Sequence, residues 1–251
     1  MRVLRRADYR AMPWKNGGGI THEVAREPAQ GESFEWRLSL ARIDRSGPFS
    51  DFSGYLRIML LLEGEGFTLR SPGEPERVFR PRGEAQRFDG ALPVQCELAG
   101  SSCTDLNLMV RDTREVSTRT ARIEAPLALR ARELPDDARR GSSGDPLRGR
   151  RDGAPVGTPC GAQHDTLILF VLQGACRVRD GAREEELAAW DTAIIEPVRA
   201  EPVRPDAAQR EASQPDAARP GVIHRGPDLR ILVSPAPDVP VPAMLFIAAV
   251  R

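Results

Sequence analysis

The first half of the chain contains short segments in which apolar and polar residues alternate. In residues 34–43, FEWRLSLARI, Trp36 and Leu38 fall on one face of an extended chain, whereas Arg37 and Ser39 fall on the other. Successive side chains of a β-strand point to opposite faces of its sheet. The alternation therefore predicts a strand with one apolar and one polar face.

Other segments of strand length follow at short intervals. Residues 105–111, DLNLMVR, alternate in the same way and put Asp105 and Asn107 on their polar face. The run LRIMLLLEG at 56–64 is short and apolar enough to be a core strand. Further strand-like segments are 76–80, 85–90 and 93–100. Short strands separated by Gly and Pro every 8–12 residues or so are typical of an antiparallel sandwich or barrel.

The second half repeats this pattern. An apolar strand, a Gly turn and a shorter strand occur at 164–181 and match the earlier run at 56–73 in kind. Strand-like segments follow at 184–197, 229–235 and 243–250. We therefore predict an all-β protein of two β-sandwich or barrel modules, with the boundary between 1–120 and 121–251.

Two segments of the second module have almost no large apolar residues. Residues 135–161 and 198–221 are rich in Pro, Arg, Asp, Ala and Gly. Such segments bury too little surface to offset the entropy of ordering the chain. We predict that both are flexible, solvated loops.

Composition excludes several classes of partner. The 36 basic residues balance the 36 acidic ones, whereas nucleic-acid binders normally carry a basic excess. No apolar run approaches the roughly 18 residues of a membrane span, and the first residues lack the apolar core of a secretory signal. The four cysteines form no CxxC pair, which favours reduced thiols. We expect a cytoplasmic protein without nucleic-acid or membrane partners and leave open a homodimer.

The most distinctive motif is PWKNGGGITHE at residues 13–23. It contains Lys15, the single lysine of the chain, beside the glycines at 17–19. Consecutive glycines allow close backbone approach or positive φ, and their amides can form a nest for a carboxylate or phosphate. The alternative is a plain flexible turn with a buried Trp14. Because the motif also crowds Asn16, Thr21 and Glu23 around the lysine, we favour an anion-binding role.

These motifs resemble the HutD/Ves family of bacterial bicupin proteins. The resemblance rests on PWKNGGGITHEV, FEWRLSLARIDRSGPFSDFSGYLRIMLLLEGEG and DLNLMVR, and it covers most of residues 1–111. It implies two cupin-like β-sandwich modules and a regulatory or small-ligand-binding role. The positions carried over are Trp14, Lys15, Asn16, Gly17, Gly18, Gly19, Thr21, Glu23, Trp36, Arg37, Ser39, Phe49, Ser50, Phe52, Gly54, Arg57, Asp105, Asn107 and Met109. One departure is Leu56, where the family pattern tends to place an acidic residue before the arginine.

The histidines argue against the usual cupin metal site. A metal-binding cupin brings together an HxH pair, a Glu and a further His. This chain has His22, His164 and His224, and the strand expected to hold the HxH pair, within GYLRIMLLLEG, contains no histidine. We expect no metal and no other cofactor.

A cupin without metal must bind through charge and hydrogen bonds. If the polar faces of 34–43 and 105–111 look into one barrel, Arg37 can clamp a carboxylate and Asn107 can orient it. The alternative is that these faces lie in solvent while the apolar faces form the core. Alternation alone does not decide between the two.

Three functional hypotheses remain open. The leading one is a metal-free bicupin that binds a small anionic metabolite and regulates or modulates histidine utilisation. Lys15 and Arg37 would neutralise its carboxylates, the amides of the three glycines would hydrogen-bond them, and Trp14 and Trp36 would wall the pocket. The alternatives are a cofactor-independent isomerase or epimerase acting on a small carboxylate, with Lys15 or Glu23 as the acid/base, and a structural interaction protein that makes contacts through its two loops.

Overall fold

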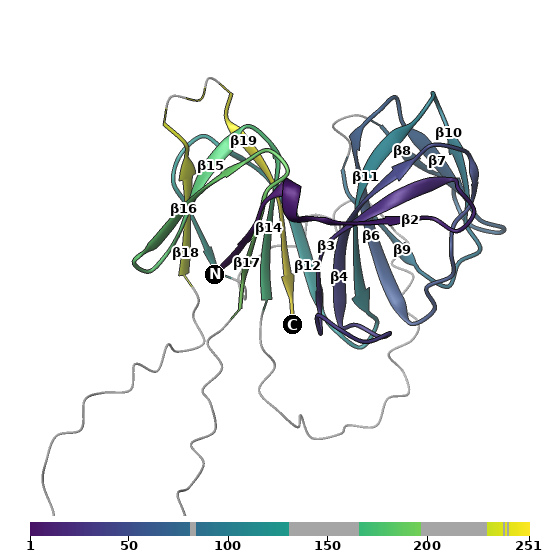
Figure 1. Cartoon of the computed structure of the whole chain (residues 1–251), viewed down its shortest axis with the longest axis horizontal. Coiled ribbons are helices and arrows are strands. Elements are labelled where there is room, and N and C mark those ends of the chain that lie inside the picture. The colour runs from purple at the N-terminus through teal and green to yellow at the C-terminus, as the bar shows by residue number, and fades with distance from the viewer. Residues whose placement is uncertain (81–83, 131–165, 197–229, 238, 240) are drawn as a thin grey trace, which may run out of the picture.

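The described residues form strands joined by turns. The computed structural model describes residues 1–80, 84–130, 166–196, 230–237, 239 and 241–251 (Figure 1). Within these ranges the only helical element is a 3₁₀ turn, η1 (Arg6–Asp8). None of the described residues belongs to a helix with the length and hydropathy needed to cross a membrane. The predicted loops at 135–161 and 198–221 lie outside the described residues.

Two modules, each made of two antiparallel sheets, lie side by side (Figure 1). The N-terminal module has a six-stranded sheet in the order β2 (Arg10–Pro13), β3 (Gly19–Glu27), β4 (Trp36–Ile43), β11 (Cys103–Arg111), β6 (Tyr55–Glu63) and β9 (Gln86–Asp89). Its second sheet has the order β5 (Gly47–Pro48), β10 (Gln95–Leu98), β7 (Phe67–Arg70) and β8 (Arg77–Phe79).

The C-terminal module has the same two-sheet plan. Its five-stranded sheet has the order β1 (Arg2–Leu4), β17 (Thr192–Ile195), β14 (Thr166–Gln173), β19 (Ala243–Val250) and β12 (Val116–Ile123). Its second sheet has the order β13 (Leu127–Arg130), β18 (Arg230–Pro235), β15 (Ala175–Asp180) and β16 (Arg183–Ala188).

The sheets do not divide the chain at a single residue. The first strand, β1, pairs with β17 and so belongs to the C-terminal module. Strand β12 runs across residue 120, where we expected the boundary, and pairs with β19 along its whole length. Local alternation marks where strands lie but does not select their partners, which are set by long-range backbone pairing.

The largest apolar core lies between the two modules. It contains Trp36 and Leu38 of β4 and Leu108 of β11, packed with Phe170 of β14 and Phe246 of β19, all at most 1% exposed. The apolar face of β4 is therefore covered by the C-terminal module. Its polar face consequently looks into the space between the two sheets of its own module.

The interiors of the two modules differ in chemistry. Leu167, Leu169 and Val171 of β14 point into the C-terminal module and pack with Leu245 and Ile247 of β19. In the N-terminal module, a second apolar core around Phe67 and Phe88 fills part of the interior. The rest of that interior is lined by polar side chains of β4, β6 and β11.

The segment between β1 and β2 binds the modules together. The Tyr9 hydroxyl donates a hydrogen bond to the Trp190 carbonyl at 2.5 Å and lies 2.8 Å from the Thr192 hydroxyl. The Arg5 guanidinium donates to the Asp191 carboxylate at 2.8 Å. These contacts join residues about 180 positions apart in sequence. They explain why the start of the chain crosses from one module to the other.

Candidate functional site

A cavity of about 510 Å³ opens into the N-terminal module. Its walls are the 12–16 turn, the 48–52 segment and the inward faces of β3, β4, β6 and β11. Nine of the predicted ligand-binding residues line it: Trp14, Lys15, Asn16, Thr21, Arg37, Ser39, Arg57, Asp105 and Asn107. The structure therefore brings together residues that are up to 93 positions apart in sequence.

Strand register aligns the polar residues of this cavity. Met109 of β11 pairs with Arg37 of β4 on one side and with Arg57 of β6 on the other. Two residues earlier, Asn107 lies opposite Ser39 on β4, whose hydroxyl donates to the Asn107 carbonyl at 3.4 Å. Residues directly opposite one another in antiparallel strands share a face. The polar faces predicted for the two strands are thus one continuous surface.

Arg57 lies almost wholly buried in the lining of the cavity, with 4% of its surface exposed. Its guanidinium lies 5.1 Å from the ring centres of Phe49 and Phe88 and 5.5 Å from that of Phe52. Burial lowers the pKa of Arg57 to about 10, and nearby Asp105 partly offsets this effect. The Arg57 Nε has no hydrogen-bond partner. The Arg57 guanidinium is therefore held among aromatic rings, whose faces attract cations, and its Nε is available to donate to a ligand.

Asp105 lies in the same cavity and is fully buried. Within the described residues neither of its carboxylate oxygens has a hydrogen-bond partner, and the side-chain oxygen of Asn107 lacks one too. Burial raises the pKa of Asp105 to about 7, against the opposing attraction of Arg57. Since buried polar groups are nearly always hydrogen-bonded, this cluster is the kind of site that a ligand or ordered water completes.

The two other predicted cations differ in their surroundings. Arg37 forms an ion pair with Glu23 of β3, with 2.7 Å between the Arg37 Nε and a carboxylate oxygen. Glu23 itself does not line the cavity. Lys15 is exposed at the cavity wall and has no ion-pair partner in the described part of the chain. Lys15 thus keeps its charge unpaired, whereas that of Arg37 is shared with Glu23.

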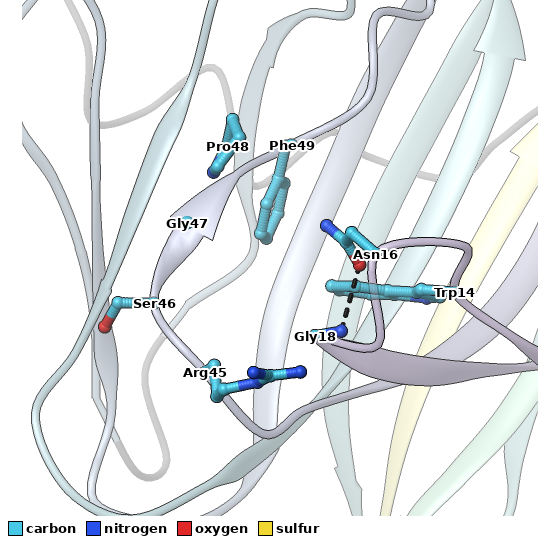
Figure 2. Close-up of a pocket in the computed structure, with 8 residues that line it drawn as sticks. All are labelled: Trp14, Asn16, Gly18, Arg45, Ser46, Gly47, Pro48 and Phe49. Carbon is cyan, nitrogen blue, oxygen red and sulfur yellow. Dashed lines mark hydrogen bonds between the residues drawn. The ribbon is translucent and has the colours of Figure 1, made fainter.

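The predicted anion nest of the three glycines does not form. The Gly18 amide donates to the side-chain oxygen of Asn16 at 2.9 Å (Figure 2), and the Gly17 amide donates to the Trp14 carbonyl at 3.0 Å. These amides are used inside the turn. Two of the glycines instead allow the backbone conformation of the turn. Gly17 has a positive φ of 64°, and Gly19 packs so close to β4 that a Cβ would meet one of its carbonyl oxygens at 2.2 Å.

Trp14 lines both this cavity and a smaller one. The smaller pocket, of about 170 Å³, is shown in Figure 2 with Trp14 and Phe49 on one side and Arg45 on the other. The Trp14 and Phe49 rings meet edge to face at 6.2 Å, and both also line the larger cavity. The Trp14 indole donates to the Thr21 hydroxyl at 2.8 Å. This bond holds the indole ring in the cavity wall.

Trp36 does not wall the cavity, contrary to our expectation. It lies on the apolar face of β4, 1% exposed, in the core between the modules. Its neighbour Arg37 faces the cavity, and adjacent strand residues point to opposite faces. The aromatic surround is supplied instead by Phe49, Phe52 and Phe88. The first two lie in the PFSDF run, but nothing in the sequence pattern pointed to their grouping around Arg57.

Among the described residues no group of three His, Cys, Asp or Glu side chains could hold a metal ion. His22 lies half-buried on β3, opposite Leu40 of β4. His164 and His224 lie outside the described residues. The described cysteines, Cys96, Cys103 and Cys176, are buried free thiols.

The comparisons with known proteins agree with the resemblance noted in the sequence. Residues 6–136, just over half of the chain, match the family model described as HutD. The chain belongs to the HutD family.

The curated relatives match somewhat less than half of the chain. An uncharacterized 21.2 kDa protein in the hutC 3′ region of Pseudomonas putida is 44% identical over 115 residues, which are 45% of this chain and 60% of that protein. Protein Ves of Citrobacter koseri is 36% identical over 111 residues, 43% of this chain and 58% of that protein. The chain thus spans about 60% of the length of these curated relatives.

A solved structure matches over the full length. HutD from Pseudomonas fluorescens SBW25, solved in a formate condition, has a TM-score of 0.61 and 25% sequence identity, covering 100% of this chain and 98% of that one. The predicted all-β bicupin architecture is confirmed.

Proposed function

We propose that this chain binds a small carboxylate anion in the cavity of its N-terminal module and acts as a modulator linked to histidine utilisation. The observation that carries the proposal is the buried Arg57 guanidinium in the cavity lining, whose Nε lacks a hydrogen-bond partner. Carboxylates are the natural partners of guanidinium groups, because charge-assisted hydrogen bonds are the strong ones.

The charges around the cavity support an anionic ligand. Lys15, Arg37 and Arg57 line it, and among the described residues the only lining carboxylate is Asp105, whose pKa is raised by burial. Glu23 offsets Arg37 from outside. The net potential is therefore positive, which favours anions over cations.

The shape of the cavity supports a small organic ligand. Its volume of about 510 Å³ falls in the range of metabolite sites, and Trp14, Phe49 and Phe52 offer it apolar contact. Formate, named in the condition of the Pseudomonas fluorescens HutD structure, is the simplest carboxylate and a natural first probe. The family association favours acidic intermediates of histidine breakdown, such as urocanate or an N-substituted glutamate.

Titration calorimetry with formate and urocanate tests this proposal. Arg57→Met keeps the length of the side chain but removes the charge, and we expect it to weaken binding by about ten- to a hundredfold. Arg42→Met is the matched control, since Arg42 is an exposed arginine on β4 outside the cavity lining. Equal affinities in wild type and Arg57→Met would defeat the proposal.

A cofactor-independent enzyme is the second candidate, and one observation favours it. A cavity carboxyl with a pKa of about 7 is well suited to general acid/base catalysis at neutral pH. Asp105 fits this role better than Glu23, which is held in an ion pair with Arg37. An isomerase or epimerase would exchange a substrate proton with solvent. Deuterium incorporation into urocanate or a glutamate derivative in heavy water, lost in Asp105→Asn, would support it.

The remaining expectations stay predictions. A structural interaction protein would use the loops at 135–161 and 198–221, and these lie outside the described residues. A cytoplasmic location and a homodimer are likewise predictions, the latter testable by sedimentation velocity.

A further inference from the structure

We propose that anion binding beside Arg57 is coupled to the uptake of a proton by Asp105, so that the charge of Asp105 sets the anion affinity of the cavity. This inference rests on the proposed function, since it concerns the same site.

The coupling follows from how the two residues are placed. Arg57 on β6 and Asp105 on β11 lie on adjacent strands of one sheet and line one cavity. Their charges attract each other, but within the described residues Asp105 accepts no hydrogen bond and forms no ion pair within 4.0 Å. The Arg57 guanidinium donates from one Nη to the Met59 sulfur at 3.5 Å, while its Nε has no partner, so it can still take another anion. An anion that does so puts a second negative charge near Asp105.

The groups around Asp105 leave few ways to compensate that second charge. Arg57 faces it from β6, and Arg37 on β4 is already paired with Glu23 of β3. Lys15 lies at the wall of the cavity, exposed to solvent.

The charge of Asp105 affects the pKa values of two nearby thiols. They are Cys96 on β10 and Cys103 on β11, and burial and the carboxylate raise the pKa of each to about 12. Both are therefore neutral at ordinary pH. His22 lies opposite Leu40, whose side chain is in the core between the modules. Because opposite residues share a face, His22 points away from the cavity and from Asp105.

Protonation of Asp105 removes the repulsion at little cost. Two like charges in a buried, low-dielectric site cannot both remain ionised without a large penalty, so one of the groups takes up a proton. Burial already holds the pKa of Asp105 at about 7. The bound anion raises it further, and the proton comes from solvent. Affinity for anions should then fall as the pH rises through neutrality.

Calorimetry with formate in buffers of different ionisation enthalpy measures this uptake directly. Formate stays ionised between about pH 6 and pH 8.5, so any linked proton belongs to the protein. We expect uptake of a substantial fraction of a proton near pH 8.5, little uptake near pH 6, and a dissociation constant about tenfold higher at the alkaline pH. Asp105→Asn, which imitates the neutral acid, should bind formate with no proton uptake and equal affinity at both pH values.

Glu35→Gln is the matched control. Glu35 is a half-buried carboxylate of the same module, paired with Arg111 at 3.1 Å outside the cavity. This variant should keep the proton uptake of the wild type.

The outcomes separate this inference from the proposed function. Formate binding that depends on Arg57 but takes up no proton, or releases one, overturns the coupling and leaves the anion site standing. If wild type does not bind formate at either pH, both fail. The buffer series on the wild type decides the question even if Asp105→Asn folds poorly.

Discussion

Replacing Asp105 by asparagine should make the protein more stable at alkaline pH and change little at acidic pH. Burial raises the pKa of this carboxyl from 3.8 to about 7. Between these values the folded protein holds a proton that the unfolded chain has lost. Stability falls with pH wherever the folded state binds more protons. Asp105 therefore lowers the free energy of unfolding as the pH rises from about 4 to about 7, and the loss persists above that pH.

The magnitude follows from the size of the shift. The difference between 3.8 and about 7 is about three units, and each unit corresponds to about 1.4 kcal/mol, so the loss is on the order of 4 kcal/mol. Asparagine has nearly the shape of the neutral acid and carries no charge at any pH. The variant should keep most of this stability at alkaline pH.

Urea denaturation at about pH 4.5 and pH 8.5 tests the reasoning. The difference in unfolding free energy between variant and wild type should be small at the lower pH and several kcal/mol at the higher. Asp112→Asn, an exposed carboxylate of the same module, is the control and should follow the wild type at both. If Asp105→Asn loses as much stability as the wild type between the two pH values, Asp105 does not titrate in this window and the argument is refuted.

Three further predictions concern backbone, hydrogen bonding and packing, each measured by urea denaturation. Gly19→Ala should lower the free energy of unfolding by about 1–3 kcal/mol or more, because the added Cβ would meet a backbone oxygen. Gly47→Ala should be nearly neutral, because an added Cβ there would meet no atom within 4 Å. Tyr9→Phe should cost about 1–3 kcal/mol because it leaves buried oxygens of the C-terminal module unpaired. Phe246→Ala should cost about 3–5 kcal/mol and still give one transition, because the core it leaves is shared by both modules. Equal effects of the two glycine changes, a neutral Tyr9→Phe, or separate transitions in Phe246→Ala would contradict these expectations.

Strand positions were predictable because they depend on local alternation. The predicted strands at 34–43, 56–64 and 105–111 correspond to β4, β6 and β11, with ends shifted by at most two residues. Hydrophobic patterning also indicated two modules. It could not assign β1 to the C-terminal module, because pairing of residues 2–4 with β17 depends on backbone contacts across some 190 residues.

Most of the candidate site was predictable for a different reason. Its polar residues alternate with apolar ones along β4 and β11, and the apolar positions set the register of the two strands. Arg37 and Ser39 therefore lie on the same face of the sheet as Asn107. The Phe rings around Arg57 were not predictable, since Phe49 and Phe52 come from the segment before β6 and Phe88 comes from β9. Only the closing of the module brings them together.

The sequence by itself determined the strands, their polar and apolar faces and the glycine-rich motif around the single lysine. Only the tertiary structure decided which face became the lining of a cavity. Alternation marks two faces but does not distinguish inside from outside when both are buried. Packing of the C-terminal module on Trp36 and Leu38 turned the apolar face into a shared core. That left the polar face, with Arg37 and Asp105 on neighbouring strands of one sheet, inside the module.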